Sequence, residues 1–198
     1  MIKNKKFISF IVCFTLIFLA GCHQQNQIGP AELTRAQQDI VDLLTVPSTE
    51  ILLFDYITAE AYVNMEFWLE VYEYGTLIDR LPGMHQIGPE PQSLDGRLAI
   101  IINQENRNGN QDFQWPFIVN GASNRFESSM TETDGLARAF GPITDPVVIQ
   151  DGKEIVLYIS QFSRGSIRTF GDMQTLVEHP ELLTEYPYAY IIKARFSR

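Results

Sequence analysis

Side chains that could act as nucleophiles or carry protons are scarce in this chain. Its 198 residues include 2 cysteines and 3 histidines. The serine-hydrolase, zinc-protease, phosphate-loop and dinucleotide-binding motifs are all missing. A serine nucleophile would need His85 or His179 as its base, and neither has a recognisable context. Acidic residues are abundant, so hydrolysis by a pair of carboxylates is the catalytic alternative that stays open. We expect no cofactor.

The clearest candidate site is a row of aromatic and acidic residues between positions 62 and 72. Apolar residues alternate there with polar or aromatic ones, which is the period of a strand with one buried face. If the apolar side faces the core, the opposite side presents Tyr62, Glu66, Trp68, Glu70 and Tyr72. Aromatic faces suit sugar rings or cations, and carboxylates orient hydroxyls or amines. Alternatively, this face packs under a helix or loop, or the aromatics are there because they suit strands.

The segment from Asn106 to Asp112 resembles an oxygen-rich calcium loop only in part. It has one carboxylate, contains Arg107 and lacks the distal glutamate that binds calcium with two oxygens. An Asn-Gly turn between strands explains the same residues. We therefore predict no metal site.

The first 22 residues have a composition unlike the rest of the chain. Three lysines, at positions 3, 5 and 6, precede an apolar run over 7–20, which ends in Leu19-Ala20-Gly21-Cys22. The run is shorter than the ~20 residues that span a membrane. A basic start, an apolar centre and a small-residue end are typical of a secretory signal peptide.

Leu19-Ala20-Gly21-Cys22 resembles the lipobox of bacterial lipoproteins at all four positions, and the resemblance is confined to residues 1–22. It implies that the chain is cut before Cys22 and that the Cys22 thiol carries acyl chains such as palmitate. The implied location is the extracytoplasmic face of the cell membrane, with membrane lipid contacted through Cys22. The alternative is an ordinary cleaved signal with an incidental cysteine.

The expected mature chain is strongly acidic. Removal of the three signal lysines leaves 12 basic against 24 acidic residues. Such a body is repelled by nucleic acid and by anionic head groups, so we exclude a nucleic-acid partner. With Cys13 removed and Cys22 acylated, the folded body has no free thiol for catalysis, disulfides or metals.

Strand patterns dominate the remainder of the chain. Thr34 and Gln37 form a capping-box pattern before a helix over 35–44, and Asp172 can cap a short helix that Pro180 interrupts. Asp151-Gly152 is typical of a type I′ hairpin turn, Pro116 indicates an edge strand or bulge, and the segment 49–57 is expected to be buried on both faces. We expect a long loop over 82–96, and over 121–135 either a second long loop or a weakly paired segment. Strands are predicted near 49–57, 62–72, 77–81, 97–104, 113–119, 147–150, 153–162, 166–170 and 188–196.

Because helices do not alternate with strands, the predicted fold is mainly β, an antiparallel β-sandwich or barrel-like domain with a short N-terminal helix and a short helix before the last strand. We expect a signal peptide over 1–21, a lipidated Cys22 and flexible tether over 22–30, and one domain over 31–198. The predicted function is a membrane-anchored binding or protein-interaction module of the cell envelope. An envelope protein, a peptide or a wall glycan could be its partner. A wall-active hydrolase and a purely structural accessory of a membrane complex are the alternatives.

Overall fold

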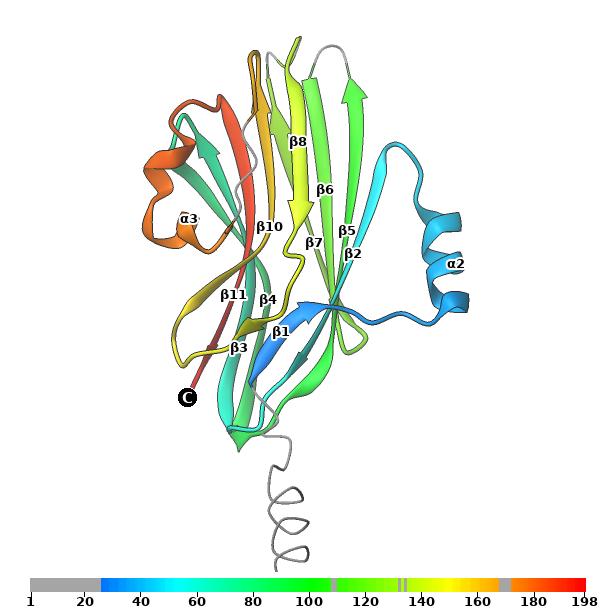
Figure 1. Ribbon diagram of the computed structural model, residues 1–198, viewed down its shortest axis with the longest axis vertical. Coiled ribbons are helices and arrows are strands. Elements are labelled where there is room, and N and C mark those ends of the chain that lie inside the picture. The colour runs from blue at the N-terminus through cyan, green and yellow to red at the C-terminus, as the bar shows by residue number, and fades with distance from the viewer. Residues whose placement is uncertain (1–25, 108–109, 132, 134, 168–171) are drawn as a thin grey trace, which may run out of the picture.

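Alternating apolar residues build two antiparallel sheets that pack face to face (Figure 1). The structure is a computed structural model that describes residues 26–198 apart from 108–109, 132, 134 and 168–171. One sheet has the order β7-β6-β5-β2-β1-β9 and the other β4-β3-β11-β10-β8. The predicted sandwich is confirmed, and it is not a closed barrel. The elements are β1 (Gln27–Pro30), α2 (Arg35–Leu44), β2 (Thr49–Ile57), β3 (Tyr62–Glu73), β4 (Thr76–Gln92), β5 (Asp95–Arg107), β6 (Asn110–Val119), β7 (Ala122–Met130), β8 (Ala137–Pro142), β9 (Val147–Val148), β10 (Glu154–Ser163), α3 (Thr175–Glu178), the 3₁₀ helix η1 (Pro180–Leu183) and β11 (Tyr188–Ser197).

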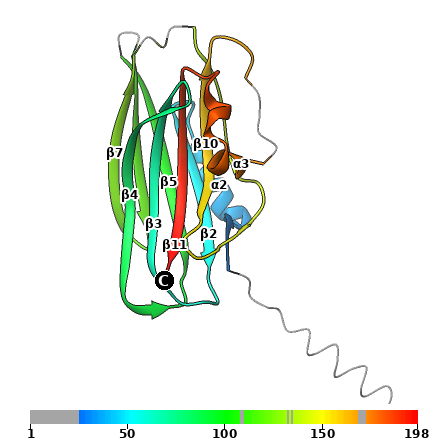
Figure 2. The same ribbon diagram turned by 90° about the vertical axis from the view of Figure 1, so that its left-hand side faces the viewer.

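Aromatic side chains fill the space between the sheets. Trp115 of β6 and Tyr190 of β11 meet across it with ring centroids 5.2 Å apart, and Phe113 lies 5.3 Å from Tyr190. A second, smaller apolar cluster lies on the outer face of the β10–β11 sheet, where Leu176 and Leu183 of α3 and η1 cover it. Figure 2 shows this sheet toward the viewer, with α3 packed on it.

The predicted capping box is confirmed, because Thr34 caps α2 through reciprocal contacts with Gln37. Tyr74 and Gly75 both have positive φ in the turn that joins β3 to β4. β11 lies between β3 and β10, at the centre of its sheet. The predicted Asn-Gly turn and the predicted strand over 166–170 fall largely on residues outside those described.

The predicted tether is partly wrong, because Gln27–Pro30 form a strand. β1 pairs with residues 54–57 of β2 on one side and with Val147 and Val148 of β9 on the other. Its four residues are too few to show a period, so their composition predicted coil. The folded part therefore begins within a few residues of Cys22.

The predicted loop over 82–96 is also wrong, and over 121–135 the paired alternative fits better than the loop, since both segments contain strands at sheet edges. Residues 82–92 belong to β4 and residues 122–130 to β7, and each strand ends its sheet. An edge strand needs backbone partners on one side only, so it tolerates proline, glycine and a polar exposed face. These residues suppressed the strand pattern in the sequence.

Pro116 does not mark an edge, because β6 lies between β5 and β7. The β5–β6 ladder runs from Leu98 opposite Val119 to Ile100 opposite Phe117, and it resumes at Asn103 opposite Gln114. Proline has no N–H to donate, so the central strand accommodates it with an interruption in one ladder.

Two further predictions fail for reasons of topology. The turn at Asp151-Gly152 forms, but its flanking strands separate: β9 joins β1 in one sheet, and β10 pairs with β8 and β11 in the other. A turn signal reports a local reversal and not the partners that follow it. β2 is buried on one face only, because its other face is the outside of the sandwich.

Two groups of polar contacts join the sheets. At one edge, Asn124 of β7 donates to the carbonyl oxygen of Gly83 in β4 at 3.0 Å. Away from that edge, Glu50 of the inner strand β2 forms an ion pair with Arg138 of β8 and accepts a hydrogen bond from the Tyr158 hydroxyl of β10 at 2.9 Å. Directional contacts of this kind fix how the two sheets are aligned.

Replacement of Gly83 should destabilise the domain. A Cβ at this position would collide with the carbonyl oxygen of Phe67, at the register shift between β3 and β4. Overpacking of this kind costs about 1–3 kcal/mol. We expect Gly83→Ala to lower the free energy of unfolding by that amount in urea denaturation. In Gly141→Ala the new Cβ meets nothing within 4 Å, so an equal loss in both variants would contradict this explanation.

Candidate functional site

The predicted row on β3 is divided between the two faces of its sheet. Glu66, Trp68, Glu70 and Tyr72 lie on the outer face as expected. Tyr62 lies on the inner face, where it packs edge-on against Phe196 with ring centroids 6.1 Å apart. The β3–β4 register shifts between Tyr62 and Asn64, and this irregularity reverses the side to which Tyr62 points.

Glu70 is the centre of a buried ion cluster and is only 2% exposed. Its carboxylate accepts hydrogen bonds from Trp68 Nε1 at 3.0 Å, the Tyr72 hydroxyl at 2.7 Å and Arg80 Nη2 at 2.7 Å. Lys193 Nζ lies 2.8 Å from it. Burial by itself would raise the pKa of Glu70, but these four donors lower it from 4.5 to about 2. The carboxylate is therefore fixed in its ionised form.

Residues of the same cluster cover the aromatic side chains that were expected to bind a ligand. The Arg80 guanidinium lies 4.6 Å from the Trp68 ring centre, and Trp68 is 4% exposed. Burial and the neighbouring Glu70 raise the pKa of Tyr72. Glu154 completes the cluster through Lys193 at 3.0 Å. Trp68 and Glu70 are thus enclosed by Arg80 and Lys193. Within the described part of the chain, only Tyr72 of this row packs under helical residues, Leu176 and Leu183, as the alternative interpretation expected of this face.

A small cavity of about 250 Å³ remains beside the cluster, lined in part by Glu66, Trp68 and Arg195. Arg195 Nε donates to Glu66 Oε2 at 2.9 Å, and His85 Nε2 lies 3.6 Å from Glu66 Oε1. The sequence row included the carboxylates here but missed their cationic partners. Lys193 and Arg195 were visible as the charged positions of the alternating last strand.

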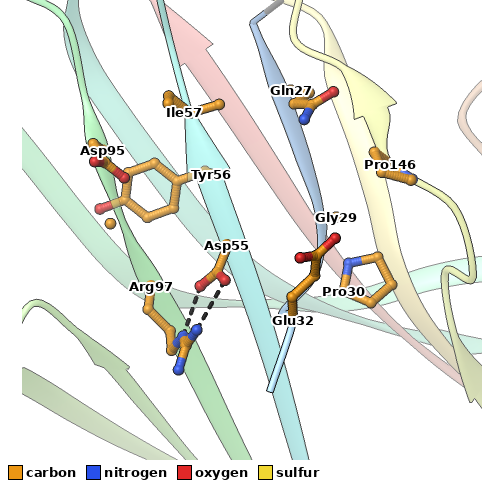
Figure 3. Close-up of a pocket in the computed structure, with 11 residues that line it drawn as sticks. Gln27, Gly29, Pro30, Glu32, Asp55, Tyr56, Ile57, Asp95, Arg97 and Pro146 are labelled. Atoms are coloured by element: carbon orange, nitrogen blue, oxygen red, sulfur yellow. Dashed lines mark hydrogen bonds and ion pairs between the residues drawn. The ribbon is translucent and has the colours of Figure 1, made fainter. Parts of the chain in front are cut away.

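A larger groove of about 640 Å³ lies over β1, β2 and β5 (Figure 3). The carboxylates of Glu32, Asp55 and Asp95 border it. Asp55 is bound by Arg97 through two hydrogen bonds of 2.6 and 2.9 Å, whereas Glu32 and Asp95 are exposed. The groove therefore presents two exposed carboxylates around a neutralised pair.

Two glycines allow neighbouring residues to pack closely beside this groove. A Cβ at Gly29 would lie 2.8 Å from Pro146 Cα, and a Cβ at Gly96 would collide with the Tyr56 hydroxyl. Close packing of Pro146 and Tyr56 thus requires glycine at both positions. Sequence analysis missed this groove because it assigned β1 to the tether and Gly96 to a loop.

A third polar group, around Arg138, is enclosed between the sheets. Arg138 donates to Ser160 Oγ at 2.7 Å and to the Tyr158 hydroxyl at 2.6 Å, in addition to its pair with Glu50. Burial is the main cause of the raised pKa of Tyr158. Each of these groups has a protein partner, so the arrangement joins the sheets and offers no proton carrier to a substrate.

A family model, described as the YgaN domain, matches residues 27–196. The chain belongs to the YgaN family. The match begins at the first residue of β1 and ends within β11, so it reaches every described strand of the sandwich and leaves out residues 1–26. No curated protein and no solved structure matches the chain.

Two features are missing from the described part of this YgaN domain chain. No helix there is long and apolar enough to cross a membrane. No group of three or more His, Cys, Asp or Glu residues there could hold a metal ion.

The Glu70 cluster should give this YgaN domain a characteristic acid transition. Because the folded pKa of Glu70 is about 2 and the unfolded one about 4.5, its stabilisation is complete above pH 4.5 and lost as the pH falls toward 2. The shift corresponds to roughly 3 kcal/mol. Urea denaturation between pH 2 and 7 measures this loss.

Glu70→Gln should lower stability at pH 7 by about 3–5 kcal/mol, because it leaves Lys193 buried without its nearest carboxylate. The loss between pH 4.5 and 2 should also become smaller in this variant. Glu73→Gln, at the exposed end of the same strand, is the matched control. Identical acid transitions in wild type and Glu70→Gln would refute the role assigned to Glu70.

Proposed function

We propose that this chain is a lipid-anchored, extracytoplasmic binding module of the cell envelope, with its ligand in the groove over β1, β2 and β5. Its partner is a peptide or protein segment that carries a basic group. The observation that carries the binding role is the open groove with the exposed carboxylates of Glu32 and Asp95 (Figure 3).

The anchor is supported by the lipobox and by its distance from the fold. Cys22 precedes the first residue of β1 by five positions. The YgaN match begins at Gln27, so the signal and the acylation site lie outside the part that the family shares. Two or three acyl chains would hold such a domain at the membrane, since each buried methylene contributes ~0.8 kcal/mol.

Binding is favoured over catalysis by the surroundings of the acidic residues. A general acid stays protonated near neutral pH when an apolar pocket surrounds it. Glu32 and Asp95 are exposed, and Asp55 is paired with Arg97. The carboxylate-pair hydrolase therefore lacks an enclosed acid among the residues of this groove.

The burial of Trp68 favours a basic peptide over a wall glycan as the ligand. Sugar recognition commonly uses an open aromatic face, and Trp68 is covered by Arg80. The groove instead offers the exposed carboxylates of Glu32 and Asp95. These groups fit an amine or guanidinium carried on an extended chain.

The anchor predicts a modified, membrane-bound protein. Protein extracted from its native membrane should have an intact mass that begins at Cys22 and includes acyl chains. The Cys22→Ala variant should lack this added mass and should no longer sediment with membranes. Mature wild-type protein found without acyl chains in the medium would overturn the anchor.

The groove predicts charge-dependent binding of a basic probe. Trilysine amide should bind at low salt, as measured by calorimetry, and the Glu32→Gln/Asp95→Asn variant should bind it at least about tenfold more weakly, a loss of ~1.4 kcal/mol. A Glu73→Gln/Asp79→Asn variant removes the same charge from exposed positions outside the groove. Equal weakening in both variants would assign the binding to overall charge and reject the groove.

A further inference from the structure

Helix α2 presents its apolar side to solvent. Ile40, Leu43 and Leu44 are 58%, 81% and 61% exposed, and no residue of α2 is buried. Figure 1 shows the helix beside the sandwich, held by the connections from β1 and to β2. A surface helix normally directs its apolar stripe toward the core, whereas α2 leaves both its apolar and its polar side exposed to solvent.

The exposed residues form one continuous stripe. Residues 36, 40, 43 and 44 recur at helical spacing, and Gln38 and Asp42 lie on the opposite side, joined by a 2.7 Å hydrogen bond. Val41, which is half-buried, faces neither group directly. A helix of ten residues is marginal without tertiary packing, so a stripe of this kind is stabilised when another apolar phase covers it.

A bilayer that holds Cys22 is within reach of the helix. Four residues separate Cys22 from Gln27, and a chain extended over these five steps spans at most about 18 Å. β1 therefore starts close to the lipid that holds Cys22. Only Ala31 to Thr34 separate the end of β1 from α2, so the helix begins 13 positions after Cys22 and can reach the same membrane surface.

A second copy of the chain is a poorer occupant than a bilayer. α2 is about 15 Å long, and two such helices cannot bury the roughly 1,200 Å² of a stable interface. An acyl anchor, by contrast, keeps the helix at the membrane surface, so a small apolar contact is sufficient. The helix is also half the length needed to span a bilayer.

We propose that α2 lies in the interfacial plane of the bilayer that holds Cys22, with Ile40, Leu43 and Leu44 among the acyl chains and Asp42 toward water. This inference rests on the proposed lipid anchor. The contact is apolar, because Asp39 and Asp42 outnumber Arg35 on the helix. It therefore forms on zwitterionic lipid without anionic head groups. It also orients the domain on the surface.

The test uses the acylated full-length mature protein in phosphatidylcholine vesicles. Since the acylated Cys22 has no free thiol, a cysteine introduced by Leu43→Cys takes a single fluorescent label, and Gln38→Cys provides the matched label on the opposite side of the helix. Nitroxide-labelled lipid quenches fluorophores that enter the bilayer. We expect quenching at position 43 to be at least about twofold greater than at position 38. Sedimentation and intact mass are recorded on the same samples.

The outcomes separate this inference from the anchor. Acylated protein that sediments with vesicles but is quenched equally at both positions overturns the helix contact and leaves the anchor intact. Unacylated protein that stays in solution overturns both. A label at position 43 that is shielded without lipid quenching, together with crosslinked dimers, assigns the stripe to a second copy and also overturns the bilayer contact.

Discussion

The contact of Glu50 with Arg138 and Tyr158 fixes the geometry on which the other sites depend. The two sheets share no backbone ladder, and apolar packing alone tolerates sliding between them. An ion pair with a 2.9 Å tyrosine hydrogen bond has a definite direction. Removal of one partner would leave a charge in surroundings that include the rings of Phe113 and Phe162. β2 is thereby aligned against β10, and β2 in turn positions β1 and the groove.

Ion pairs also determine which charges stay free on the outer face of the sheet that contains β3 and β11. Glu70 and Lys193 are enclosed in a neutral cluster, so this face offers little free charge despite its many ionisable residues. The acidic excess of the chain is left for surfaces such as the groove with Glu32 and Asp95. The buried ion network thus determines where on the domain a charged partner can be recognised.

The sequence predicted elements whose information is local. The α2 capping box needs only Thr34 and Gln37, and the period of β3 is contained in one segment. The edge strands β4 and β7 were missed because an edge tolerates Pro82 and polar side chains. The site was harder to predict, because the ion-pair partner of Glu70 is Lys193, which lies more than a hundred positions away in the sequence. The need for glycine at positions 29 and 96 is likewise visible only in the fold, where Pro146 and Tyr56 pack against them.

The position of β1 has a consequence for the order in which the chain can fold. Gln27 pairs with Ile57 and also with Val148, so both neighbours of β1 are synthesised later than the strand itself. Pairing across such separations must first offset the entropy of closing a long loop. The strand β1 is therefore among the last to be completed. Until Val147 and Val148 have been synthesised, one edge of β1 stays unpaired.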